Sequence, residues 1–294
     1  MFRTRLMQWI TDRYPTRGMH GSRFRLPLYR LLLGLARPRG RITLRTRDYR
    51  INFSPAVKDI AHGIALHQPW EPFCSRVFAS LLRPGMRVYD IGANIGHYTL
   101  IAAQAVGPGG RVDAFEPFPA HCADLAANVA LNGLDNVIVH KLACGEDTCG
   151  GVLHTDAANP GGHSFTPSNL AARGPAVRVR TTTLDALARN SRHRPPAHLI
   201  KMDAQGAEGA ILRGGRETLR IHRPMLVMEF WPYGLKHAGE SPAQVLELLT
   251  GLGYRLRNID EIDSTLKDVS PEQLLGAYPE TVDYGFTNLL ATMD

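Results

Sequence analysis

Short apolar segments alternate with segments of helical pattern along most of the 294-residue chain. Apolar runs bounded by Gly, Pro, Asn or Asp predict buried strands, and apolar positions three and four residues apart predict helices. The predicted strands begin at Met86, before a glycine loop, and continue over 111–115, 136–142, 177–181, 198–202, 225–230, 254–259 and 286–292. Helices are predicted over 70–82, 122–131, 184–188, 206–219 and 242–252, and another after Gly96.

Strands that alternate with helices in this way are typical of an α/β fold with a parallel sheet. We therefore expect a Rossmann-like domain whose mostly parallel, seven-stranded sheet carries helices on both faces. The last strand is expected to run antiparallel at an edge of the sheet. The segment from 145 to 175 is rich in Gly, Ser, Thr, Asn and Pro, which predicts a long loop with a functional role.

The strongest local pattern is the strand, glycine loop and helix around residues 86–105. Gly92 permits a tight turn at the end of the strand, and Gly96 lets the backbone approach a ligand and the helix behind it. Asp90, before the first glycine, would repel a pyrophosphate and attract a cationic amine. The spacing of the two glycines also differs from the dinucleotide pattern. These features favour S-adenosylmethionine, with its amino group and sulfonium, over NAD.

A second acid supports this interpretation. Glu116 ends the strand over 111–115, about 20 residues past the loop, where an acid binds the ribose hydroxyls of a nucleotide cofactor. The alternative is that Glu116 is a solvated loop residue. The combined pattern is that of a class I methyltransferase. The residues predicted to bind the cofactor are Asp90, Gly92, Asn94, Gly96, Tyr98, Thr99, Glu116, Pro117, Cys144 and Asp203.

Lys201, Asp203 and Glu229 form a second group of polar residues, at the ends of two further strands. Lys201 and Asp203 are two residues apart, so their side chains are expected on one face of the sheet. Asp203 and Glu229 follow strands that we expect to be neighbours, so both would stand over the cofactor's methyl group. We predict these three as catalytic residues.

Three more residues are predicted to contact the substrate: Glu208, His163 and Ser164. Glu208 lies in the first turn of a predicted helix, where a carboxylate also caps the helix, and this alternative stays open. His163, like His97, is a candidate base, although a lone loop histidine is more often an ordinary polar side chain.

Four segments give the chain a resemblance to the FkbM family of S-adenosylmethionine-dependent methyltransferases. They are 90–96 (DIGANIG), 115–117 (FEP), 183–185 (TLD) and 201–208 (KMDAQGAE), in the order and spacing of the family domain. The resemblance implies methyl transfer to a hydroxyl, often of a sugar or polyketide. Gln205 stands where the family frequently has Glu, so no role of an acid is carried over to that position.

The expected chemistry is simple, because the sulfonium methyl is already electrophilic and the protein has mainly to position the acceptor and take its proton. We expect Asp203 to be the general base or substrate clamp, with Glu229 orienting the acceptor and Lys201 pairing with Asp203. Neighbouring acids also bind Mg²⁺ in proteins, but without a third evident ligand no metal is predicted. Two alternatives remain: an RNA methyltransferase, and a catalytically silent module that binds the cofactor.

Charge separates the chain into two parts. Residues 1–50 hold 13 Arg and two Asp, a net charge of +11, so the remainder carries 7 − 11 = −4. We predict a basic extension over 1–55, with amphipathic helices and a hairpin over 42–53, and a methyltransferase domain over 56–294. The basic part suits an anionic membrane surface, an anionic substrate or nucleic acid, of which nucleic acid is least favoured; packing on the domain or in a homodimer is the alternative.

Composition supports a cytoplasmic location, with peripheral contact at the inner face of the membrane as an expectation. No apolar run of about 18 residues predicts a membrane-spanning helix, and no signal peptide is recognised. The four cysteines form no zinc-binding pattern, so we expect free thiols. They are Cys74, Cys122, Cys144 and Cys149.

Overall fold

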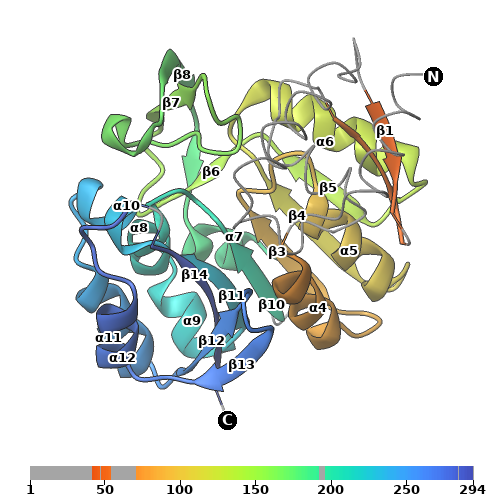
Figure 1. The fold of residues 1–294 in the computed structure, drawn as a ribbon. Coiled ribbons are helices and arrows are strands. Elements are labelled where there is room, and N and C mark those ends of the chain that lie inside the picture. Colours follow the sequence, from red (N-terminus) through yellow and green to blue (C-terminus); the bar gives the residue numbers. More distant parts are fainter. Residues whose placement is uncertain (1–41, 47, 54–70, 192–195, 284, 294) are drawn as a thin grey trace, which may run out of the picture.

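The computed structural model describes residues 42–46, 48–53, 71–191, 196–283 and 285–293 (Figure 1). The predicted helices within 1–35 lie outside these residues. The strands are β1 (Ile42–Arg45), β2 (Arg50–Phe53), β3 (Arg87–Ile91), β4 (Arg111–Phe115), β5 (Val137–His140), β6 (Ala143–Cys144), β7 (Gly151–Asp156), β8 (Arg173–Val179), β9 (Thr181–Thr182), β10 (Leu199–Met202), β11 (Met225–Phe230), β12 (Arg255–Asp260), β13 (Thr265–Asp268) and β14 (Thr287–Thr292).

The helices surround the central sheet (Figure 1). They are α4 (Pro72–Leu81), α5 (His97–Val106), α6 (Pro119–Leu131), α7 (Leu184–Asn190), α8 (Glu208–Arg213), α9 (Arg216–His222), α10 (Pro232–His237), α11 (Pro242–Gly251) and α12 (Pro271–Ala277), with a 3₁₀ helix, η2 (Pro167–Asn169). Among the described residues, no helix is long and apolar enough to cross a bilayer.

The central sheet confirms the predicted class, an α/β fold of the class I methyltransferase kind. Its strand order is β13-β12-β14-β11-β10-β3-β4-β5, and β11, β10, β3, β4 and β5 run parallel. Two details differ from the prediction. The sheet has eight strands, because the short segment β13 pairs with β12. The last strand, β14, runs antiparallel as expected but lies between β11 and β12 and not at an edge.

The position of β14 follows from its side chains. Leu289, Leu290 and Ala291 are all buried, although neighbouring residues of a strand point to opposite faces of the sheet. A strand that buries both faces belongs inside a sheet, where both of its edges are also paired.

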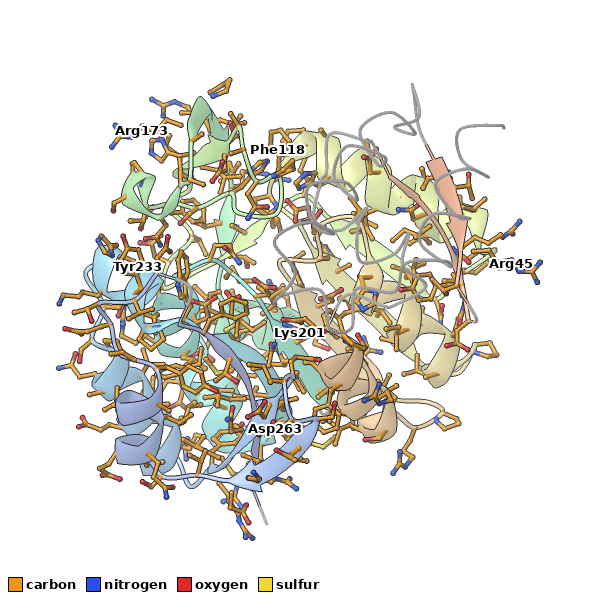
Figure 2. All side chains as sticks on the ribbon, viewed as in Figure 1. Arg45, Phe118, Arg173, Lys201, Tyr233 and Asp263 are labelled. Carbon is orange, nitrogen blue, oxygen red and sulfur yellow. The ribbon has the colours of Figure 1, made fainter. Side chains whose placement is uncertain are left out.

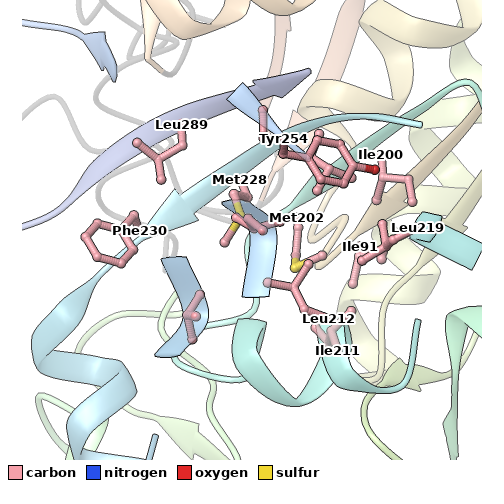
Figure 3. Packing of buried hydrophobic residues seen from close by; sticks show 14 of the residues in the cluster. Ile91, Ile200, Met202, Ile211, Leu212, Leu219, Met228, Phe230, Tyr254 and Leu289 are labelled. Carbon is pink, nitrogen blue, oxygen red and sulfur yellow. The ribbon is translucent and has the colours of Figure 1, made fainter. Parts of the chain in front are cut away.

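Two apolar clusters hold the helices to the two faces of the sheet. Met202 and Met228 point to one face and pack with Leu212 of α8 (Figure 3). Val227 points to the other face, where it belongs to a cluster with Phe78 of α4. This alternation places Lys201 on the face that α4 and α5 cover, because it lies between two residues of the first cluster.

The predicted hairpin near the start of the chain is confirmed: β1 and β2 pair antiparallel. It is attached to the domain through side-chain amides of α6. Asn52 donates its backbone N–H to Asn128 Oδ1 and accepts from Asn128 Nδ2, and Arg50 donates its backbone N–H to Asn132 Oδ1 at 2.8 Å. The Tyr49 hydroxyl makes a 2.6 Å hydrogen bond with Nδ1 of His97, at the start of α5.

The segment predicted as a loop over 145–175 contains regular structure. β7 and β8 form an antiparallel hairpin, with η2 between them. The hairpin projects beyond the sheet (Figure 1). The strand predicted over 177–181 covers the end of β8 and the start of β9, and neither belongs to the central sheet. Every residue of β8 is exposed or half-buried, so its first half lacks the apolar run that marks the buried strands.

The predicted helix over 206–219 is instead two helices, α8 and α9, separated by Gly214 and Gly215. A Cβ at Gly214 would lie 2.2 Å from the carbonyl oxygen of Gly145, and one at Gly215 would lie 2.6 Å from a Leu184 methyl group. Both glycines therefore allow close packing on the segment from β6 to α7. The short helices α10 and α12 were not predicted.

Candidate functional site

A cavity of about 770 Å³ lies at the carboxyl ends of β3, β4, β10 and β11. Residues 159–163 and 168–171, which connect β7 to β8, line one side of it. Most of the predicted site residues line the cavity: Asp90, Gly92, Asn94, Tyr98, Glu116, Pro117, Cys144, His163, Lys201, Asp203 and Glu229. Four do not belong to its lining: Gly96, Thr99, Ser164 and Glu208.

The glycine loop packs against the end of β10. Gly92 has φ of 78°, and a Cβ there would lie 1.8 Å from the carbonyl oxygen of Asp203, so only glycine fits. Gly96 has φ of 102°, and its missing side chain leaves room for Leu125 of α6. Gly96 therefore acts through helix packing.

Asp90 is buried at the end of β3 and accepts a hydrogen bond from the Thr99 hydroxyl. Burial raises the pKa of Asp90 to about 6, opposed by this hydrogen bond and by the charge of Lys201. Thr99 thus acts through Asp90. The carboxylate lines the cavity, where a cation beside it would favour its ionised form.

Glu116 is held by backbone groups on both of its oxygens. Oε2 accepts from the N–H of Asn94 and Oε1 accepts from the N–H of Phe118, both at 2.8 Å. Each oxygen retains a lone pair for a ligand hydroxyl. Asn94 has φ of 50°, and its buried Oδ1 has no partner among the described residues. The carboxylate and this oxygen are acceptors at the wall of the cavity.

Asp203 and Glu229 are brought together, as the neighbouring strands predicted. Gln205 Nε2 donates to Oδ1 of Asp203 at 2.8 Å and to Oε2 of Glu229 at 3.2 Å. Burial raises the pKa of Glu229 well above its ordinary value, and the charge of Asp203 raises it further. Glu229 therefore tends to keep its proton next to Asp203.

Lys201 is 1% exposed, and Figure 2 shows it near the centre of the view. Its Nζ donates to the carbonyl oxygen of Met202 at 3.3 Å and lies 4.8 Å from the centre of the Tyr98 ring. No carboxylate of the described residues is within ion-pair distance of it. Burial lowers the pKa of Lys201, but the charges of Asp203 and Glu71 outweigh burial and raise it above its ordinary value, so the ammonium group stays charged.

Glu71 precedes α4 and lines the same cavity, although it was not among the predicted site residues. Its carboxylate accepts from the Tyr98 hydroxyl and from Nδ2 of Asn288, each at 2.7 Å. Its φ of 48° lies in the left-handed region, which costs free energy for a residue other than glycine. An acid followed directly by Pro72, at the start of a predicted helix, was the available signal.

Glu208 and Ser164, two predicted residues outside the cavity lining, bind backbone groups next to the cavity. Glu208 accepts from the backbone N–H groups of Ala204 (2.7 Å) and Gly206 (3.0 Å), which favours the capping alternative. Ser164 donates to the carbonyl oxygen of Gln205 at 2.8 Å and so fixes the loop that carries the amide.

The two candidate bases, His163 and His97, both have ring nitrogens that make hydrogen bonds within the protein. His163 Nδ1 accepts from the backbone N–H of Asp156, and burial and the nearby His121 lower the pKa of His163 to about 4. At neutral pH His163 is therefore a neutral ring whose Nε2 carries the proton, which makes it a donor and a weak base. His97 bonds Tyr49 on one nitrogen and Ser75 on the other, so its bonds are structural.

Aromatic side chains form the far wall of the cavity, beyond β11 and β14. Trp231, Tyr233 and Phe286 line it. The indole N–H of Trp231 donates to the carbonyl oxygen of Asp283 at 2.6 Å, and the Trp231 and Tyr233 ring centres are 5.9 Å apart. Asn169 of η2 donates to the carbonyl oxygens of Gln205 and Gly234, which attaches the hairpin insertion to this wall.

A family model described as the methyltransferase FkbM domain matches residues 90–256. These residues include the glycine loop, Glu116, Lys201, Asp203 and Glu229. No curated protein matches the sequence.

Three solved structures illustrate the similarity in fold. A methyltransferase FkbM from Methylobacillus flagellatus is 15% identical, with 80% of this chain and 53% of that chain covered and a TM-score of 0.41. TYW2 from M. jannaschii, in complex with AdoMet, is 16% identical, with coverages of 86% and 85% and a TM-score of 0.44. A SAM-dependent O-methyltransferase from Thermotoga maritima is 14% identical, with coverages of 89% and 81% and a TM-score of 0.42. The chain thus spans about half of the Methylobacillus protein.

Proposed function

The chain belongs to the FkbM family of S-adenosylmethionine-dependent methyltransferases, and from this premise we propose that it methylates a hydroxyl group of a sugar, a glycan or a polyketide-type molecule. The proposal concerns the acceptor and the residues that handle it. The observation that carries it is the pair of carboxyl groups, Asp203 and Glu229, joined by one amide at the cavity wall.

The residues of the cavity fit the cofactor. Glu116 offers one free lone pair on each oxygen for the two ribose hydroxyls, and the unpartnered Oδ1 of Asn94 lies beside it. Pro117 and the buried Cys144 offer apolar contact for the adenine ring. A cavity of about 770 Å³ is within the range of small-molecule sites and leaves room for an acceptor.

The bound cofactor supplies an electrophilic methyl group on a sulfonium. The protein has to orient the acceptor hydroxyl and receive its proton as the oxygen attacks. We assign the proton-accepting role to the carboxylate of Asp203, at the end of β10. Glu229, whose pKa burial raises, keeps its proton and donates a hydrogen bond that orients the acceptor. Two neighbouring acids can act as a proton acceptor and a proton donor when their surroundings move their pKa values apart.

The wall beyond these acids supports a neutral, ring-containing acceptor. Trp231, Tyr233 and Phe286 offer flat apolar faces, and Gln205 and Asn169 lie beside them as polar side chains. Aromatic faces next to amides and carboxyl groups suit the apolar faces and hydroxyl edges of a sugar or a macrocycle. The carboxylate of Asp203 at the same wall would repel the phosphates of RNA, which counts against the nucleic-acid alternative.

The test is to find the acceptor and then reproduce the reaction. Metabolites and surface glycans from cells with and without the gene are compared by mass spectrometry for the loss of one methyl group. The purified protein and labelled cofactor should then restore that methyl group on oxygen. A labelled nitrogen or carbon, or label appearing only in RNA, would contradict the proposal. Absence of turnover with every extract would favour the silent binding module.

A further inference from the structure

Lys201 and Glu71, one basic and one acidic, both line the cavity and both contact the side chain of Tyr98. The ammonium of Lys201 lies over the face of Tyr98, and the hydroxyl of Tyr98 donates to the carboxylate of Glu71. The two charged residues come from β10 and from the start of α4, far apart in the sequence. Tyr98 therefore fixes both charges relative to each other.

The ammonium group is incompletely paired. Of the three N–H bonds of Lys201, the described residues accept one, at the carbonyl oxygen of Met202. A buried cation is costly unless anionic or polar acceptors surround it. Since Lys201 is buried and lines the cavity, an anionic oxygen of a ligand would complete its shell.

Glu71 is the complementary group. Its oxygens accept from Tyr98 and from Asn288, both uncharged donors, and no cation of the described residues lies within ion-pair distance of it. Burial raises the pKa of Glu71, opposed by the charge of Lys201, and a ligand's ammonium group beside it would favour its ionised form. Asp90 lies next to Lys201 in the sheet, because β10 and β3 pair in that register, and it adds a second acidic side chain. The same part of the cavity thus offers one cation and two acids.

We propose that Lys201 binds the α-carboxylate, and Glu71 the α-ammonium, of the amino-acid end of the cofactor. A ligand that carries both an ammonium and a carboxylate group satisfies both residues, which favours an amino acid over a simple amine or acid. The geometry therefore gives Lys201 a role in holding the cofactor. Tyr98 acts as the positioning residue of this pair.

The test uses a set of four ligands and calorimetry on the full chain. S-adenosylhomocysteine carries both charged groups. 5′-Deoxy-5′-(3-aminopropylthio)adenosine lacks the carboxylate, 5′-deoxy-5′-(3-carboxypropylthio)adenosine lacks the amine, and 5′-methylthioadenosine lacks both. Charged hydrogen bonds of this kind change affinity about 10- to 100-fold. The intact protein should therefore bind S-adenosylhomocysteine most tightly and 5′-methylthioadenosine most weakly.

Two variants test which residue binds the carboxylate and which binds the ammonium group of the ligand. Lys201→Met should weaken binding about 10- to 100-fold for the two ligands that carry a carboxylate and leave the other two unchanged. Glu71→Gln should do so for the two that carry an amine. Lys236→Met and Glu217→Gln change exposed residues outside the cavity and serve as matched controls.

Equal losses for all four ligands would mean that Lys201 and Glu71 only support the fold, and would overturn the proposal. The ligand set keeps it testable if a variant does not fold. Equal affinity of the intact protein for S-adenosylhomocysteine and 5′-methylthioadenosine would overturn it without any substitution. Neither outcome depends on the acceptor, so the proposed hydroxyl methylation is tested separately.

Discussion

Gln205 donates a hydrogen bond from its side-chain amide to the carboxylate of Asp203 over 2.8 Å. The same nitrogen also reaches Glu229, at 3.2 Å, so one neutral group lies between two acids. Gln205 has φ of 51°, a left-handed conformation that costs free energy for a residue with a side chain. At this place in the cavity an amide donates to both acids, where the glutamate frequent in the family would add a third acid.

Gln205→Glu should make folding stability more dependent on pH. Near pH 5 the new carboxyl group keeps a proton and still donates to one neighbour. Its folded-state pKa is raised by two adjacent acids, so the folded protein loses stability as pH rises above the unfolded pKa of about 4.3. We expect a loss of about 1–3 kcal/mol at pH 8 relative to the parent, and less at pH 5, from urea unfolding.

The control for this comparison is Gln104→Glu, which makes the same change at an exposed position of α5. It should alter stability by less than about 0.5 kcal/mol at either pH. Equal effects of the two variants would show that the amide of Gln205 does not hold the two acids.

Asp203→Asn should leave cofactor affinity nearly unchanged and slow methyl transfer by roughly 10²–10⁴, the range for a lost general base. Asparagine has the same shape but cannot take the proton of the acceptor. Single-turnover transfer of labelled methyl to the identified acceptor measures the effect, with the exposed Asp263→Asn as control. Full activity would reassign proton transfer to Glu229.

A chelator should leave the rate unchanged, and inhibition relieved by Mg²⁺ would indicate a metal site.

Glu116→Ala should weaken S-adenosylhomocysteine binding by about 1.5–3 kcal/mol, because charged hydrogen bonds to the ribose would be lost. The backbone groups of Asn94 and Phe118 lose their acceptor as well, so part of the effect is a looser loop. Calorimetry measures the change, with the exposed Glu247→Ala of α11 as control. Unchanged affinity, or binding of NAD by the intact protein, would contradict the assignment of this end of the cavity.

Binding of S-adenosylhomocysteine should weaken as pH falls through about 6. The pKa of Asp90 is raised to about 6, mainly by burial, so the carboxyl group is protonated below that pH and no longer attracts the ligand's ammonium group. For one group the affinity changes at most about tenfold per pH unit. Calorimetry from pH 5 to 8 should show this fall for the parent and a flatter profile for Asp90→Asn. A decline of equal size for 5′-methylthioadenosine, which has no ammonium group, would rule out Asp90 as the cause.

The parallel strands were predictable because strands buried on both faces form continuous apolar runs, as 225–230 shows. β13 was not predicted, and β8 was predicted only at its end, within 177–181, since neither strand has a buried residue. Asp90, Glu116, Asp203 and Glu229 were found because each follows a strand. The positions of Glu71 and Gln205 in the cavity depend on left-handed backbone conformations, which no periodicity reveals. Trp231 and Phe286 line the same cavity because β14, which follows Phe286, lies beside β11.

The basic segment at the start of the chain lies outside the described residues. A chain without residues 1–40 should keep its affinity for S-adenosylhomocysteine. The cut precedes β1, so the hairpin keeps its bonds to Asn128 and Asn132, and the cofactor residues begin only at Glu71. Most of the charge of +11 in residues 1–50 would be lost, and with it attachment to anionic vesicles, at about 1 kcal/mol per basic residue near the surface.

Vesicle sedimentation and thermal melting of the two chains separate this expectation from its competitor. Attachment of the full chain should weaken as salt rises past about 0.15 M, because exposed charges are screened there, and the shorter chain should melt at nearly the same temperature. If residues 26–35 instead cover the domain or a second copy, their removal exposes apolar surface. The shorter chain would then melt much earlier or aggregate, and the full chain would ignore anionic vesicles even at low salt.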